Sequence, residues 1–66
     1  MITIDQQIEE VRRELGKRRQ VYPRLISQRK MRQSEADYIN ARMEAVLATL
    51  IWCRDLIAKV KAEAGE

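Results

Sequence analysis

The feature that most constrains this 66-residue chain is an uncharged stretch near its middle, the nine residues from Ala45 to Cys53. On a helix, two lines of apolar residues run through it and face nearly opposite directions, because each residue turns the helix by about 100°. The first line holds Ile39, Met43, Val46, Leu50, Cys53, Ile57 and Val60, and the second holds Ala41, Ala45, Ala48, Trp52 and Leu56. A helix that is apolar on opposite sides needs cover on both. The stretch therefore predicts assembly with other helices.

A first helix is predicted from Ile4 to about Val21, residues 4–21. Thr3 and Gln6 have the spacing of a capping box, in which each side chain bonds the other residue's backbone N–H. An apolar stripe follows at spacings of four, three and four, made of Ile4, Ile8, Val11 and Leu15. Gly16 interrupts this pattern at a cost of about 1 kcal/mol relative to alanine, which its helix-favouring neighbours offset.

Pro23 is expected to end that helix, because proline has no N–H to donate and disfavours helical geometry at the residue before it. Proline also suits the first position of a helix, so a short second helix is predicted over about residues 23–28. A long helix is then expected over about residues 34–62, with the hydroxyl of Ser34 as its cap.

The lengths of these helices predict an all-α helical hairpin in one domain, residues 1–66. At 1.5 Å per residue the first helix is about 25 Å long and the last about 45 Å, so one covers only part of the other. The predicted interface with a second subunit is the second apolar line, Ala41, Ala45, Ala48, Trp52 and Leu56. Its alanines let another helix approach closely, and Trp52 is a large anchor. We expect a homo-oligomeric helical bundle, with parallel and antiparallel pairing both open.

Positive charge is concentrated around the expected bend. Residues 12–32 carry nine basic side chains against Glu14 alone, a balance of +8, whereas residues 1–11 sum to −3 and residues 33–66 to −2. Such an excess is most simply explained by an anionic partner. Arginine can grip phosphate through two bonds at once, and Tyr22 can stack on a base. The predicted ligand-binding residues are Arg18, Arg19, Tyr22 and Arg24, with Arg12 and Lys30 beside them.

Two structural explanations of the same charges compete with a binding site. Arg18 lies on the continuation of the apolar stripe, where an ion pair with Asp37 or Glu35 would satisfy it. The whole cluster could instead be a solvated face braced by pairs along the helix, such as Glu9 with Arg13 and Glu14 with Arg18, each contributing a few tenths of a kcal/mol.

The composition argues against catalysis and metal binding. The chain has no histidine and one cysteine, so neither a zinc site nor an internal disulfide is expected, and no cofactor is implied. Cys53 lies on an apolar line, where a small buried hydrophobe is its usual role. Tyr38 precedes Arg42 by four residues, a spacing that allows the two side chains to stack. The absence of a secretory signal or a long apolar run favours a protein of a reducing compartment, the cytoplasm, with no membrane partner.

One short motif carries a resemblance. With Val21-Tyr22-Pro23-Arg24 followed by Lys30-Met31, the chain resembles short uncharacterised helical proteins of tailed phages and prophages, over about residues 8 to 51. The likeness continues at Glu35-Ala36, Ile39, Met43 and Thr49-Leu50. Those proteins often have glycine at the position of Arg29 and threonine at that of Arg32, as for a glycine turn and a helix cap. The resemblance implies a phage accessory protein acting in a bacterial cytoplasm.

Three functions follow as hypotheses. The first is a non-enzymatic oligomer that binds a small phosphorylated ligand at the basic bend. Small helical phage proteins that sequester nucleotide signals of bacterial immunity suggest, by analogy, an anti-defence role. The second is a DNA- or RNA-binding accessory factor, whose affinity would fall steeply with salt. The third is a protein-interaction module that inhibits a host factor through Trp52 or the basic face.

Overall fold

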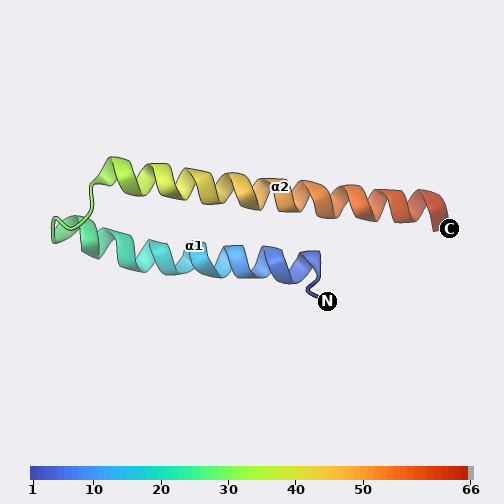
Figure 1. Ribbon diagram of the computed structural model, residues 1–66, viewed down its shortest axis with the longest axis horizontal. Coiled ribbons are helices and arrows are strands. Elements are labelled where there is room, and N and C mark those ends of the chain that lie inside the picture. Colours follow the sequence, from blue (N-terminus) through green and yellow to red (C-terminus); the bar gives the residue numbers. More distant parts are fainter. Residues whose placement is uncertain (66) are drawn as a thin grey trace.

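The computed structural model describes residues 1–65 and is a hairpin of two packed helices (Figure 1). Helix α1 spans Ile4–Ser27 and helix α2 spans Gln33–Gly65. The molecule measures 55 × 20 × 15 Å. The C-terminal part of α2 continues beyond the first turn of α1, so part of α2 has no partner in this chain (Figure 1). The all-helical hairpin predicted from the sequence is confirmed.

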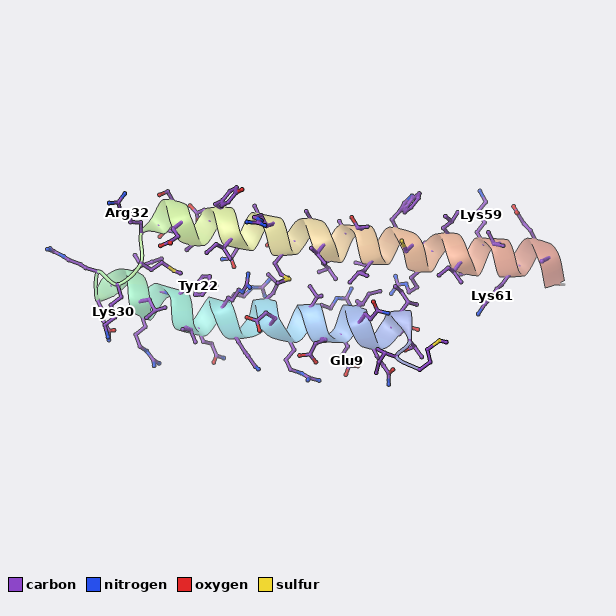
Figure 2. All side chains as sticks on the ribbon, viewed as in Figure 1. Glu9, Tyr22, Lys30, Arg32, Lys59 and Lys61 are labelled. Atoms are coloured by element: carbon purple, nitrogen blue, oxygen red, sulfur yellow. The ribbon has the colours of Figure 1, made fainter. Side chains whose placement is uncertain are left out.

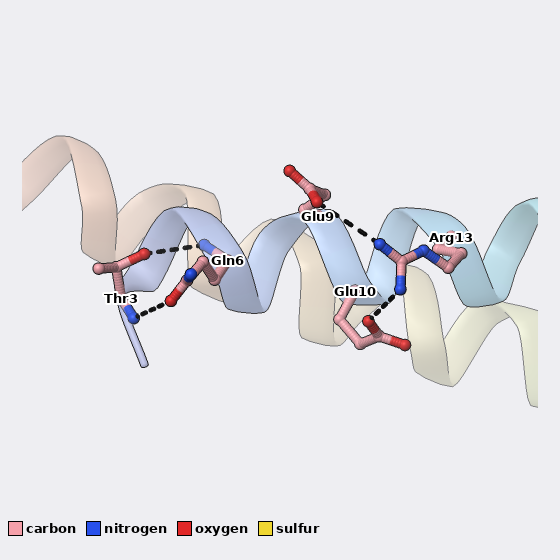
Figure 3. Close-up of polar contacts among 5 residues, drawn as sticks. All are labelled: Thr3, Gln6, Glu9, Glu10 and Arg13. Carbon is pink, nitrogen blue, oxygen red and sulfur yellow. Dashed lines mark hydrogen bonds and ion pairs between the residues drawn. The ribbon is translucent and has the colours of Figure 1, made fainter. Parts of the chain in front are cut away.

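The start of α1 is fixed by the capping box that the sequence predicts. The Gln6 backbone N–H donates to the Thr3 hydroxyl at 3.1 Å, and the Thr3 backbone N–H donates to the Gln6 side-chain oxygen at 2.9 Å (Figure 3). Two backbone donors that have no partner within the helix are thereby satisfied. Asp5 follows in the first turn, where the helix dipole favours a negative charge.

Helix α1 does not end before Pro23. It continues through the proline to Ser27, so the predicted end near Val21 and the separate short helix over residues 23–28 are both wrong. Proline removes one backbone donor, but the remaining donors after it still form a last turn. That turn half-buries Leu25 and Ile26. Burial of these two side chains, together with the hydrogen bonds of the bend, outweighs the local cost of the proline.

The bend closes α1 with the pair of hydrogen bonds of a Schellman motif. The Lys30 N–H donates to the Leu25 carbonyl at 2.8 Å, and the Arg29 N–H donates to the Ile26 carbonyl at 3.0 Å. Arg29 has a φ of 60°, in the left-handed region that glycine adopts most easily. An arginine there costs roughly 1–2 kcal/mol. The position where the resembling proteins often have glycine is therefore the left-handed residue of this turn.

Helix α2 begins at Gln33, one residue before the predicted start, and extends to Gly65 rather than ending near Ala62. The Ala36 N–H donates to the Arg32 carbonyl at 3.1 Å, which makes Arg32 the residue that precedes the first turn. The prediction that Ser34 caps this helix is wrong, because Ser34 lies within the first turn. An arginine side chain carries only donors and cannot accept from backbone N–H groups.

Very few side chains are buried between the helices. Among the described residues, only Ile8, Leu15 and Ala36 are buried hydrophobic residues, with exposed fractions of 3%, 8% and 2%. Ile8 and Leu15 belong to the predicted stripe of α1, which is confirmed as its core-facing side. On α2 the half-buried side chains include Ile39, Met43, Leu47 and Leu50, whereas Val46 and Val60 remain about half exposed. The hairpin alone therefore leaves much of the apolar surface of α2 in water.

Replacing Gly16 by alanine is expected to stabilise the hairpin. A methyl group built at Gly16 meets no atom within 4 Å, and alanine in a helix interior is more favourable than glycine by about 1 kcal/mol. We expect Gly16→Ala to raise the free energy of unfolding in urea by about that amount. Lys17→Ala, on the neighbouring exposed position, is the control and should change it by less than about 0.5 kcal/mol. A loss of stability in Gly16→Ala would mean that another subunit packs closely at this position.

Replacing Arg29 by glycine is expected to relieve the unfavourable backbone conformation of the bend. We expect Arg29→Gly to raise the unfolding free energy by about 1 kcal/mol, measured by thermal and urea denaturation. Gln28→Gly is the matched control, because Gln28 has a negative φ of −84° and gains nothing from glycine. Equal effects of the two substitutions would contradict this account of the bend.

Candidate anion-binding site at the bend

A hollow of about 450 Å³ lies between the two helices near the bend and is called the inter-helix hollow below. Arg18, Arg19, Tyr22 and Ile26 of α1 and Gln33 and Asn40 of α2 are among the residues that line it. Figure 2 shows Tyr22 on the side of α1 that faces α2, close to the bend. Three of the predicted ligand-binding residues, Arg18, Arg19 and Tyr22, thus share one hollow.

Arg18 is held in place on the wall of this hollow by contacts with both helices. Its side chain is only 14% exposed, and its Nε donates to a carboxylate oxygen of Glu14 at 3.1 Å. One terminal nitrogen donates to the Ile39 carbonyl at 3.4 Å, and the guanidinium lies 5.7 Å from the centre of the Tyr22 ring. The predicted pair of Arg18 with Glu14 is confirmed.

The alternative pairing of Arg18 with Asp37 or Glu35 is wrong. A spacing of four residues places Glu14 beside Arg18 on the same helix face, within reach of its guanidinium. The Asp37 carboxylate instead accepts a hydrogen bond of 2.8 Å from the side-chain amide of Gln33.

Asn40 is the residue of this hollow that the sequence analysis missed. Its side-chain oxygen is buried and accepts no hydrogen bond from any described residue. A buried acceptor without a donor destabilises a protein by about 1–3 kcal/mol. The available signal was its position, four residues after Ala36 and three before Met43, on the side of α2 that faces α1. A polar side chain on the side of α2 that faces α1 is unexpected unless another group forms a hydrogen bond with it.

The other predicted binding residues lie apart from this hollow. Arg12 and Arg24 are exposed on α1 and do not line it. Lys30 lines a second, open hollow of about 760 Å³ at the bend, together with Arg29 and Arg32. The two hollows adjoin, because Ile26 lines both. The structure therefore divides the six predicted residues into three between the helices, Lys30 at the bend, and Arg12 and Arg24 apart from both hollows.

Most of the positive charge around the bend is not neutralised. In the part of the chain that the structure describes, only Arg13 and Arg18 of the nine basic residues have an acidic partner. Arg13 contacts Glu9 at 3.5 Å and Glu10 at 2.8 Å (Figure 3). The remaining seven are Arg12, Lys17, Arg19, Arg24, Arg29, Lys30 and Arg32. Bracing by ion pairs along the helix therefore accounts for a minority of the cluster.

Tyr38, Arg42 and Cys53 lie on α2 and line neither of these two hollows. The Arg42 guanidinium lies 5.6 Å from the centre of the Tyr38 ring, as the spacing allowed, and Cys53 is a half-exposed free thiol. Across residues 1–65, no group of three or more acidic, cysteine or histidine side chains is arranged to hold a metal ion. Neither helix, within those residues, has an apolar segment of the length needed to cross a bilayer.

Comparisons with known proteins do not assign a family. No family model matches the chain, and no curated protein or solved structure is similar enough to count as a match. The resemblance to short phage proteins therefore stays a prediction. The inter-helix hollow and the charge around the bend are the features that bear on function.

Replacing Asn40 by leucine is expected to increase stability. Leucine has a similar shape and removes the buried oxygen that has no donor, so we expect Asn40→Leu to raise the unfolding free energy by about 1–2 kcal/mol. Asn40→Asp is the matched control, because it retains the shape and buries a charge, and it should lower stability. A destabilised Asn40→Leu protein would show that the amide is already satisfied in solution.

Proposed function

We propose that this chain is a non-enzymatic protein that binds a nucleotide in the inter-helix hollow, one ligand site to each hairpin. The observation that carries the proposal is the buried, unpartnered oxygen of Asn40 in the same hollow as Arg18, Arg19 and Tyr22. A phosphate alone would need only the arginines. An acceptor for a base and an aromatic ring beside them favour a ligand that has both a phosphate and a base.

Each of these side chains has a distinct role in the proposed complex. Arg19 is exposed and has no acidic partner among the described residues, so its guanidinium is free to hold a phosphate. Arg18, fixed by Glu14, adds positive charge and supports the Tyr22 ring. The ring can stack on a base. The Asn40 carbonyl is buried in the free chain, so a base reaches it only when this side chain turns toward the hollow. It can then accept a hydrogen bond from an amino or imino group of that base.

The phage resemblance supplies the biological setting of the proposal. It suggests an accessory protein in the cytoplasm of a bacterial host that sequesters a nucleotide signal of host immunity. Seven basic residues have no acidic partner among residues 1–65. They agree with a protein that competes for an anion present at low concentration, because their field draws anions toward the bend.

Self-association is the second part of the proposal. A hairpin with only three buried hydrophobic residues among those described has little core of its own, and chains of this size commonly depend on oligomerisation. The predicted interface residues Ala41, Ala45, Ala48, Trp52 and Leu56 are all exposed in the single chain and are thus free to meet a second subunit.

A nucleic-acid-binding function is the second candidate, favoured by the same seven unpaired basic residues spread over α1 and the bend. The two functions differ in which residues matter. A nucleic acid would engage exposed basic residues roughly equally, and each lost contact would reduce the dependence of affinity on salt. A nucleotide in the inter-helix hollow would engage Arg19 and leave Arg24 without a role.

The decisive comparison is between Arg19→Ala and Arg24→Ala. The two substitutions remove the same charge from exposed positions on α1, but only Arg19 lines the hollow. We would titrate the purified protein by calorimetry with nucleoside mono-, di- and triphosphates and cyclic dinucleotides. Loss of one charge-assisted bond should weaken binding by about 10-fold or more in Arg19→Ala, and by less than about 2-fold in Arg24→Ala.

Two further results would decide between the candidates. Asn40→Leu should bind the nucleotide more weakly although its fold is more stable, which separates a binding defect from unfolding. Equal losses in Arg19→Ala and Arg24→Ala, with single-stranded DNA bound more tightly than any nucleotide, would contradict the hollow as the site and favour nucleic-acid binding.

A further inference from the structure

The side of α2 that α1 does not cover carries an exposed apolar surface, called the outer face below. It consists of Tyr38, Ala41, Ala45, Ala48, Trp52 and Leu56, which helical spacing brings to one side. Tyr38 and Trp52 are each 65% exposed, and Leu56 is 44% exposed. Figure 2 shows the end of α2 that carries Lys59 and Lys61 reaching past α1, so helix α2 continues beyond its partner helix. An exposed surface with two aromatic rings is typical of an interface.

The chain exposes more surface than a compact monomer of its mass, and the excess is close to the area that one subunit buries in a dimer. The chain exposes 5527 Å², whereas a compact monomer of 7.8 kDa exposes roughly 4,400 Å². Its radius of gyration is 16.1 Å, against about 11 Å for a compact domain of this length. The surplus, roughly 1,100 Å², is comparable with the area of about 800 Å² that each partner buries in a typical stable dimer.

We propose that a second copy of this chain packs on the outer face, with the two α2 helices antiparallel. This inference rests on the self-association that the proposed function includes, and it adds the surface and the orientation. The distribution of side-chain size along the outer face favours this orientation. After Tyr38 at its start, the first half holds Ala41, Ala45 and Ala48, and the second half holds Trp52 and Leu56.

Antiparallel pairing sets the bulky half of one helix against the small half of the other. Trp52 and Leu56 then fill the space that the partner's alanines leave, and the helices can approach closely along the whole contact. Parallel pairing would set Trp52 against Trp52 and leave the alanines of both helices facing one another across a gap. Close packing therefore favours the antiparallel orientation.

Charge favours the same orientation. Residues 33–49 of α2 carry three acids and Arg42, a balance of −2, whereas residues 50–65 carry three basic side chains and two acids, a balance of +1. Antiparallel helices bring these opposite balances together. Parallel helices would instead align the two acidic halves and place two basic bends of +8 each side by side, where like charges repel.

The orientation has a consequence for the nucleotide site. In an antiparallel pair the two bends lie at opposite ends of the α2 contact, so their arginines do not converge on one shared pocket. Each inter-helix hollow is then formed by one chain alone, and both remain accessible while the outer faces are buried. The dimer therefore binds two ligands independently.

Disulfide trapping distinguishes the two orientations directly. On a Cys53→Ser background, which removes the only native thiol, we would prepare Ala41→Cys and Leu56→Cys separately, mix them, and oxidise the mixture mildly. Antiparallel pairing predicts a cross-linked product that joins the two variants, identified by mass spectrometry, with little product from either variant alone. Self-linked products from each single variant would show parallel pairing and overturn the inference.

Sedimentation separates a wrong orientation from the absence of a dimer. We expect Trp52→Ala to weaken self-association by at least 10-fold, while Val21→Ala, an apolar exposed position on α1, leaves it unchanged. If the native chain sediments as a monomer at high micromolar concentration, both the proposed self-association and the proposed interface are wrong. A dimer unaffected by Trp52→Ala would overturn the interface alone. Neither result touches the nucleotide site, which the Arg19 and Arg24 variants test.

Discussion

The narrow contact between α1 and α2 is the constraint on which the rest of this protein depends. One helix presents Ile8 and Leu15, the other presents Ala36 and a row of half-buried side chains, and little else is removed from water. Two helices meeting along one line can bury only one side of each. Because α2 is apolar on more than one side and extends past α1, much of its remaining apolar surface is exposed to solvent in the single chain.

The bend combines two conformationally unfavourable choices of residue. Arg29 occupies a left-handed position, and Arg32 stands before the first turn of α2, where its side chain cannot accept from the backbone and its charge opposes the helix dipole. Glycine and threonine would suit these positions better. Residues that reduce stability are often retained where they serve a function. Two arginines at such positions, beside Lys30, agree with a surface whose purpose is to attract anions.

The proposed site and the proposed interface occupy different parts of the hairpin. Arg19, Tyr22 and Asn40 lie between the helices near the bend, whereas Trp52 and Leu56 lie on the uncovered side of α2. Assembly can therefore supply stability without covering the hollow. Asn40 relates stability to binding, because its buried oxygen has no donor among the described residues, and a ligand that donates to it would offset that cost.

The sequence by itself determined the elements that depend on neighbours along the chain. These are the capping box of Thr3 and Gln6, the buried stripe of α1, the pair of Glu14 with Arg18, and the hairpin as a whole. Only the tertiary structure decided features that depend on contacts across the two helices. Packing of the last turn carried α1 through Pro23, the rotation of α2 exposed Val46 and enclosed Asn40, and the path of the bend separated Lys30 from Arg19. Local sequence propensity does not include such contacts, because they join residues that are far apart in the chain.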